Sequence, residues 1–257
     1  MFLRKQISRF VLSPFLLGGI SLLLGWGLWE IAARLADLPA FILPTPENVL
    51  LRFWRAVRYG SLSLHLWATL SEILLGLVLG TIIATVFGYL IAHSRLLERL
   101  LSPYLVASQA VPMVAVAPLL VIWFGPGMIS KVLICALIVF FPILINTIVG
   151  IRGVPRPLYD LMYALHASRW QILRYLEIPA ALPVFLGGLR IGATLSVIGA
   201  VVGELVGADR GLGFLINVGR GQYDTALVFV SIFMLVFLAL ALYGLVMFLE
   251  RWLVRGR

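Results

Sequence analysis

Hydrophobic residues form six long runs along the chain, separated by short polar segments. Each run is about as long as the roughly 20 residues that a helix needs to cross a bilayer, and this length argues against a β-barrel. Helices buried in soluble domains are usually shorter. The pattern therefore predicts an all-α integral membrane protein with about six transmembrane helices in a single domain, residues 1–257. The runs cover residues 13–34, 66–92, 101–124, 127–150, 184–207 and 226–249.

The composition agrees with a membrane location and narrows the function classes. The chain is 62% hydrophobic and only 12% charged, far from the composition of an ordinary globular protein. The net charge is +9, but Lys and Arg lie between the runs rather than on one basic face, so we expect no nucleic-acid partner. The single cysteine, Cys135, excludes a disulfide or a thiolate metal site within one chain. His, Asp, Glu and Ser residues form no recognisable constellation, so we expect neither catalytic nor metal-binding residues.

The distribution of Lys and Arg predicts the orientation of the spans. Twelve of these residues fall in the segments that include both termini, and six fall in the alternate segments. The positive-inside rule then places both termini and residues 159–183 in the cytoplasm. The first apolar run resembles a signal peptide, but it is longer than the usual apolar core and further spans follow, so we expect a retained helix. On the other side, PTPENVLLRFWRAV (residues 44–57) predicts an amphipathic helix lying on the outer surface.

Residues 159–183 interrupt the apolar chain with a basic, helix-forming sequence. Their apolar positions keep helical spacing, which predicts a pair of amphipathic helices. Pro155 and Pro157 fit a helix start, and Pro179 and Pro183 fit helix ends, so we expect a discrete rigid element. Two interpretations remain open on these grounds: a helix that docks in a groove of a partner protein, and an interfacial helix held to lipid headgroups by its arginines.

The same segment resembles a known motif. DLMYALHASRWQILRYLEIPAALP (residues 160–183) is similar to the cytoplasmic EAA loop of ABC importer permeases, where E-A-A-x-x-x-G leads into a helix that ends in I/L-P-x-x-x-P. Asp160, Leu161 and Met162 stand at the E-A-A positions, and His166 stands at the glycine. Because His166 replaces glycine, its turn must either avoid a positive φ or use the tolerance of histidine for that conformation.

Further motifs extend this resemblance over most of the chain. VPMVAVAPLLVIWFGPGMISKV resembles the P-x-x-A-x-x-P-L-x-x-x-W-F-G-x-G stretch of the nitrate, sulfonate and taurine branch. FFPILINTIVGIRGVP and GLRIGATLSVIGAVVGEL resemble the fourth and fifth spans of that branch, and GLGFLI resembles its G-L-G-x-x-I segment. The chain thus resembles the permease subunits of type I ABC importers.

The resemblance implies a fold, partners and a site. Permeases of this kind share the type I importer fold, pair as homodimers among the lipids of the bacterial or archaeal plasma membrane, and span it several times. They bind two cytoplasmic ATP-binding subunits and receive a small solute from a periplasmic or surface-anchored binding protein. This chain has no G-x-x-x-x-G-K-[ST] motif, so we expect no cofactor in it, and we expect ATP and Mg to bind the partner ATPase. The resemblance implies a coupling loop at about residues 151–183, with these ATPase-coupling residues: Asp160, Ala164, His166, Ala167, Ser168, Arg169 and Gln171.

Ionisable residues inside spans are costly and usually face protein or water. Glu72 and Arg190 lie near span ends and are expected to snorkel or to pair locally. Glu204 lies deeper, so roles in the pathway, in a gate and in helix packing remain open for it. Pro112 and Pro118 should bend the third span and free backbone carbonyls. The candidates for the translocation pathway are Gln109, Met113, Asn146 and Glu204.

An ATP-independent secondary transporter or channel remains the alternative function. Such a protein would show charged pairs in mid-span, broken inverted repeats or a selectivity-filter motif, and none is evident in the sequence. The solute is not identified, because the solutes of the resembled branch range from nitrate, sulfonates, taurine and bicarbonate to thiamine pyrimidine precursors and riboflavin.

Overall fold

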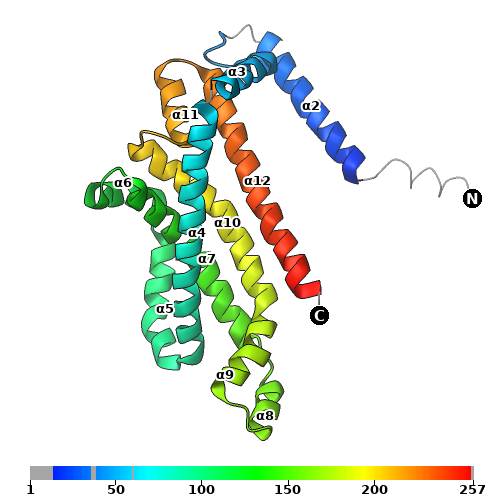
Figure 1. Ribbon diagram of the computed structural model, residues 1–257, viewed down its shortest axis with the longest axis vertical. Helices are drawn as coiled ribbons and strands as arrows, with labels where there is room; N and C mark the ends of the chain where they lie inside the picture. Colours follow the sequence, from blue (N-terminus) through cyan, green and yellow to red (C-terminus); the bar gives the residue numbers. More distant parts are fainter. Residues whose placement is uncertain (1–13, 36–38, 60, 256–257) are drawn as a thin grey trace, which may run out of the picture.

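Helices account for the secondary structure of the described part of the chain (Figure 1). The computed structural model describes residues 14–35, 39–59 and 61–255. In chain order the elements are α2 (Pro14–Leu35), α3 (Pro46–Arg58), α4 (Ser61–His93), α5 (Arg95–Ala110), α6 (Met113–Phe124), α7 (Met128–Arg152), α8 (Arg156–Ala164), α9 (Arg169–Ile172), the π-helix η1 (Leu173–Glu177), α10 (Ile178–Gly207), α11 (Leu212–Gly221) and α12 (Thr225–Arg255).

Several of these helices are built to cross a bilayer. Within the described ranges, four continuous helical segments are long and apolar enough to do so: Leu62–His93, Met128–Arg152, Arg169–Gly207 and Thr225–Val254. The first predicted run is also helical, because α2 continues for 22 residues. The prediction of an all-α membrane protein is confirmed.

The third predicted run, residues 101–124, is not one continuous helix. It is divided between α5 and α6, and the division falls at Val111 and Pro112. Proline has no amide hydrogen, so Pro112 cannot extend α5 and instead occupies the N-cap position of α6. The 12 residues of α6 extend only about 18 Å, less than the roughly 30 Å of a hydrocarbon core. The expected bend at Pro112 is therefore a break, whereas Pro118 lies inside α6 without interrupting it.

The core of the bundle is the packing of α7 between α4 and α10, which are its two main neighbours. Small residues allow these backbones to approach closely, as is common in membrane helix pairs. A Cβ atom at Gly80 of α4 would lie 2.6 Å from the carbonyl oxygen of Ala136 on α7, and one at Gly199 of α10 would lie 2.9 Å from the Cα of Cys135. Cys135 is fully buried there, which agrees with a packing role.

The two ends of the bundle differ. Figure 1 shows α8 and α9 together at one end of the long axis, and α3 and α11 at the opposite end. Helix α2 leaves the bundle beside α3 and contacts it mainly through Trp29, whose ring stacks on Phe229 of α12 and whose Nε1 donates to the Pro44 carbonyl at 3.1 Å. Most of the other described side chains of α2 are exposed, although Ala33 is buried.

Candidate functional site

The predicted coupling segment begins as the prolines indicated. Helix α8 starts directly after Pro155, and Pro157 lies in its first turn, where a missing amide hydrogen is tolerated. It ends in a Schellman motif: the amide of Ala167 donates to the Met162 carbonyl at 2.9 Å, and the amide of His166 donates to the Tyr163 carbonyl at 2.9 Å. His166 has a φ of 55°, so histidine takes the left-handed conformation that glycine usually supplies.

A capping box connects this turn to α9. The Ser168 hydroxyl accepts a hydrogen bond from the Gln171 amide at 3.3 Å, and the Gln171 side-chain oxygen accepts one from the Ser168 amide at 2.7 Å. Two of the predicted coupling residues therefore shape the turn by binding each other. The turn is rigid because backbone amides at both helix ends that it joins are hydrogen-bonded.

The predicted helix ends at Pro179 and Pro183 are wrong. The second helix of the segment begins at Arg169 and continues without a break to Gly207, so it forms the start of the fifth span rather than a separate element. The π-helical turn Leu173–Glu177 precedes Pro179 and changes the hydrogen-bonding register there. Such a turn absorbs the missing proline amide while the helix continues.

Glu177, at the end of this π turn, joins three elements. Its carboxylate accepts a hydrogen bond from Tyr159 of α8 at 3.1 Å and lies 2.9 Å from Nε2 of His93 at the end of α4. Burial and the nearby Glu177 carboxylate raise the pKa of Tyr159, so its hydroxyl keeps the proton that it donates. Glu177 is only 3% exposed. Glu177 and His93 were not predicted as site residues, and the available signal was an acidic residue at the apolar start of a span.

The predicted coupling segment exposes several large apolar side chains. None of the residues of α8 is buried, and Leu161, Leu165 and Trp170 are 55%, 69% and 64% exposed. The predicted coupling residues Asp160, Ala164, His166 and Arg169 are exposed beside them, and Ala167 is half-buried. The segment thus presents a mixed apolar and polar surface at the tip of the molecule.

Glu204 lies at a contact between three helices rather than in open space. Its Oε1 accepts a hydrogen bond from the Thr69 hydroxyl of α4 at 2.6 Å, and its Oε2 accepts one from the Gly213 amide in the first turn of α11. The Thr69 oxygen in turn accepts from the Leu212 amide at 2.8 Å, and the His65 ring accepts from the Gly211 amide at 3.0 Å. A carboxylate at a helix N-terminus is favoured by the helix dipole. These contacts, with only 1% of Glu204 exposed, favour the packing role among the three that the sequence left open.

The other pathway candidates lie elsewhere. The Asn146 side chain donates to the Pro142 carbonyl of its own helix at 2.8 Å and packs against Gly188 of α10. Gly188 is about 24 Å along α10 from Glu204, at 1.5 Å per residue, so Asn146 and Glu204 do not meet. Gln109 and Met113 belong to the end of α5 and the start of α6. Their side chains lie outside the described part of the structure.

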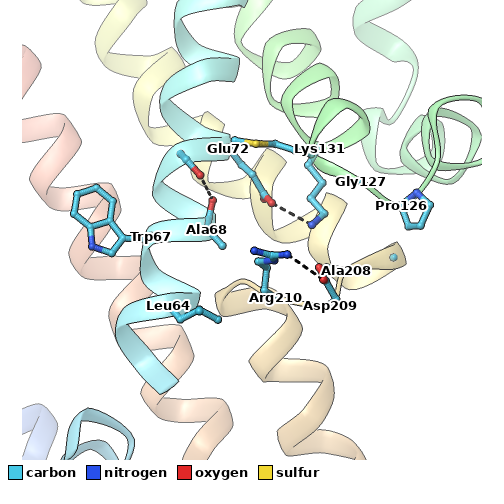
Figure 2. Close-up of a pocket in the computed structure, with 13 residues that line it drawn as sticks. Leu64, Trp67, Ala68, Glu72, Pro126, Gly127, Lys131, Ala208, Asp209 and Arg210 are labelled. Atoms are coloured by element: carbon cyan, nitrogen blue, oxygen red, sulfur yellow. Dashed lines mark hydrogen bonds and ion pairs between the residues drawn. The ribbon is translucent and has the colours of Figure 1, made fainter. Parts of the chain in front are cut away.

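A cavity of about 1110 Å³ opens between α4, α7 and the end of α10 (Figure 2). Glu72 of α4 and Lys131 of α7 point toward one another there, with Nζ 3.1 Å from Oε1, and both residues are 3% exposed. Asp209 and Arg210 form a second, exposed pair, 3.4 Å apart. The expected local pairing of Glu72 is confirmed. Lys131 was missed, although it is the one lysine within an apolar run.

Arg190 also pairs locally, as expected. Its guanidinium forms an ion pair with Glu250 and lies over the Tyr243 ring, with 5.4 Å from Cζ to the ring centroid. Both partners belong to α12, so the pair holds α10 against that helix. Charges within the long helices are thereby compensated by protein groups.

The fold and these sites define a multi-pass helical membrane protein with a helix–turn–helix segment at one end and a cavity with charged lining residues toward the other. Residues 76–257 match the family model described as binding-protein-dependent transport system inner membrane component. The chain belongs to this family and is the membrane-spanning permease subunit of an ABC importer for a small solute.

Individual relatives cover almost the whole chain. The riboflavin transport system permease protein RibX of Chloroflexus aurantiacus is 52% identical over 92% of this chain and 88% of that protein. The formylaminopyrimidine transport permease protein ThiX of Halalkalibacterium halodurans is 38% identical over 90% of this chain and 91% of that protein. A putative aliphatic sulfonates transport permease protein, SsuC of Bacillus subtilis, is 35% identical over 90% and 83%.

A solved structure supports the fold. The MetNI methionine ABC transporter in an inward-facing conformation matches with a TM-score of 0.64 at 21% identity, over 77% of this chain and 97% of that chain. The predicted type I importer permease fold is confirmed.

Proposed function

We propose that this permease works as one of two copies that enclose the translocation pathway of an ATP-driven importer. Two cytoplasmic ATP-binding subunits hold ATP and Mg. One of them docks on the coupling segment of each permease copy. A periplasmic or surface-anchored binding protein delivers the solute at the opposite end. The complex lies in the plasma membrane of a bacterium or archaeon, with both termini of this chain in the cytoplasm.

The exposed apolar face of α8 is the observation that carries this proposal. Leu161 and Leu165 are 55% and 69% exposed, and α8 lies at the tip of the molecule, away from most of the length of the described spans (Figure 1). An exposed apolar cluster rimmed by polar residues is typical of a protein–protein contact. The Schellman turn and the capping box keep this face rigid, which suits a helix that docks in a groove.

The connection from α8 to the spans supports a transmission role. A displacement of α8 reaches α4 and α10 together, because Tyr159 and His93 share the Glu177 carboxylate. Closure of the ATPase pair would then rock these spans as rigid bodies between inward and outward states. A floppy loop could not transmit such a displacement.

The break between α5 and α6 supports a pathway beside these helices. Backbone groups freed at Val111 and Pro112 are tolerated at membrane depth only where they are buried in protein or line water. Gln109 and Met113 flank this break, which keeps them as pathway candidates. Asn146 and Glu204 stay candidates of lower rank, because their side chains already bind neighbouring protein groups.

Helix α2 supports pairing with a second copy. Leu22 and Leu23 are 76% and 74% exposed, and a groove of about 560 Å³ lies between α2, α3 and α12. Lipid covers part of such a surface, and the apolar face of a second copy would fit the remainder.

Co-purification tests the docking proposal. Membranes that contain the permease and candidate ATPase subunits are solubilised, and the ATPase recovered per permease is measured. We expect Leu161→Asp to abolish recovery, because a charge would enter the apolar contact. Ile42→Asp is the matched control, since Ile42 is 53% exposed but precedes α3 at the opposite end.

Each result has a clear meaning. Loss of the ATPase from Leu161→Asp alone supports the coupling role, provided that the variant elutes from gel filtration as the wild type does. Equal recovery in both variants would refute docking on α8. No recovery with the wild type would put an ATP-independent transporter ahead.

A further inference from the structure

The cavity over Glu72 and Lys131 has the features of a binding site. It lies at the end of the bundle opposite the coupling segment, and Figure 2 shows the Glu72 carboxylate directed from α4 into the space that α7 and the loop after α10 enclose. Its volume of about 1110 Å³ is slightly above the roughly 300–1,000 Å³ usual for ligand pockets. A solute of the size of a vitamin fits within it.

The floor of this cavity carries unused hydrogen-bonding capacity. Glu72 Oε1 binds Lys131, but Glu72 Oε2 is buried and has no hydrogen-bond partner among the described residues. The contact with Glu72 uses one of the three ammonium hydrogens of Lys131. An acceptor and a donor therefore stand side by side, and an unpaired buried carboxylate oxygen is costly unless a ligand satisfies it.

The charges of the cavity exclude one class of solute. Glu72 and Lys131 form an ion pair at the floor, Asp209 and Arg210 form one at the rim, and the buried Glu204 carboxylate lies close enough to Glu72 to interact with it. An anion such as a sulfonate would bring a further negative charge close to Glu72, Glu204 and Asp209, and the two cations among the described lining residues, Lys131 and Arg210, are already paired. A neutral solute meets no such cost.

We propose that this cavity binds a neutral solute through an N–H/C=O edge, such as an amide, a lactam or a cyclic imide. The N–H donates to the free oxygen of Glu72, and the carbonyl accepts from Lys131. Leu64, Pro126 and Met128 supply apolar walls. The inference rests on the proposed function, because this end of the bundle must be the one that receives the solute.

The chemistry separates the cargoes named for the relatives. Riboflavin contains a cyclic imide and formylaminopyrimidine contains a formamide, whereas taurine and aliphatic sulfonates carry a sulfonate group. The cavity of this chain fits the first group.

Equilibrium binding to the full-length permease in lipid nanodiscs tests the proposal, with riboflavin as a fluorescent probe. We expect saturable binding that taurine does not displace. The analogue 3-methylriboflavin lacks the imide hydrogen and should bind at least about tenfold more weakly, the equivalent of one lost hydrogen bond. This comparison leaves the protein unchanged, so it does not depend on the folding of any variant.

Paired substitutions locate the site. Glu72→Met combined with Lys131→Met removes the two charges together, and we expect at least about tenfold weaker riboflavin binding. The matched control is Arg190→Met with Glu250→Met, which removes an ion pair between α10 and α12. The control should bind riboflavin as the wild type does.

The outcomes separate this inference from the proposed function. No saturable riboflavin binding, equal binding of 3-methylriboflavin, displacement by taurine, or unchanged binding in the Glu72/Lys131 variant would overturn the cavity assignment. Recovery of the ATPase through α8 is measured on the same preparations. If the permease binds its ATPase but not riboflavin, the proposed importer function stands and the cavity assignment fails. If it binds riboflavin but no ATPase, only the cavity assignment stands.

Discussion

At the scale of single residues, Gly211 shows how closely the Glu204 contact is built. Gly211 has a φ of 122°, a conformation that L side chains rarely adopt, and a Cβ atom there would overlap the Glu204 carboxyl group. The carboxylate reaches the first amides of α11 only because this position has no side chain. The G-L-G sequence noticed in the chain therefore serves a packing purpose.

Replacement of this glycine should be costly. We expect Gly211→Ala to lower the free energy of unfolding by about 2–4 kcal/mol, from backbone strain and the clash with Glu204 together. Thermal unfolding in detergent, followed by tryptophan fluorescence, measures the loss. Gly221→Ala at the other end of α11 is the control, because a Cβ atom added there would meet nothing within 4 Å. Equal stability of the two variants would contradict the packing role of Glu204.

At the scale of elements, the turn after α8 determines the shape of the coupling segment. His166 adopts the left-handed conformation so that the amides of His166 and Ala167 can close the helix end. Glycine reaches this conformation at lower cost than histidine, and a β-branched residue reaches it at higher cost. Histidine in place of the family glycine therefore preserves the turn at some cost in conformational free energy.

Substitutions at His166 should show this order. We expect His166→Gly to slow hydrogen–deuterium exchange in a peptide covering residues 160–172, and His166→Val to accelerate it, with about 1–2 kcal/mol separating the two variants. Exchange in a peptide from α12 serves as the internal control. If His166→Val is protected as well as His166→Gly, the turn does not depend on the left-handed conformation.

At the scale of the whole molecule, close packing of α4, α7 and α10 places the two candidate sites at opposite ends of one rigid unit. The helices approach through glycines, and the same helices carry Glu72 and Lys131 at one end and His93 and Glu177 at the other. Under the proposed function, we expect a movement at the coupling segment to reach the cavity through packed backbone rather than through mobile loops.

The glycine contacts should be sensitive to added volume. Gly80→Ala would place a Cβ atom 2.6 Å from the Ala136 carbonyl oxygen, and we expect a loss of about 1–3 kcal/mol in stability from overpacking. Thermal unfolding in detergent measures it. Gly244→Ala in α12 meets nothing within 4 Å and should be neutral or stabilising by up to about 1 kcal/mol. A stable Gly80→Ala variant would mean that α4 and α7 can move apart.

The start of α8 and the turn after it could be predicted from the sequence, because the residues that form them are neighbours along the chain. The start of α8 at Pro155 and the turn at His166 follow from local backbone chemistry, and the capping pair Ser168 and Gln171 lies within one turn. The ends expected at Pro179 and Pro183 failed because a π turn carries the helix past them. Proline removes one backbone hydrogen bond from a helix, and a change of register in the neighbouring backbone can compensate for this loss.

By itself, the sequence determined the membrane class, the apolar runs and the family, since these depend on local hydrophobicity and on motifs that are contiguous in the chain. Only the tertiary structure decided which buried charges meet. Glu72 faces Lys131, and Glu177 faces His93 and Tyr159. Glu204 accepts a hydrogen bond from an amide in the first turn of α11 instead of facing an open pathway. These pairings join residues far apart in the chain, so they depend on how the helices pack and rotate against one another, which no local pattern specifies.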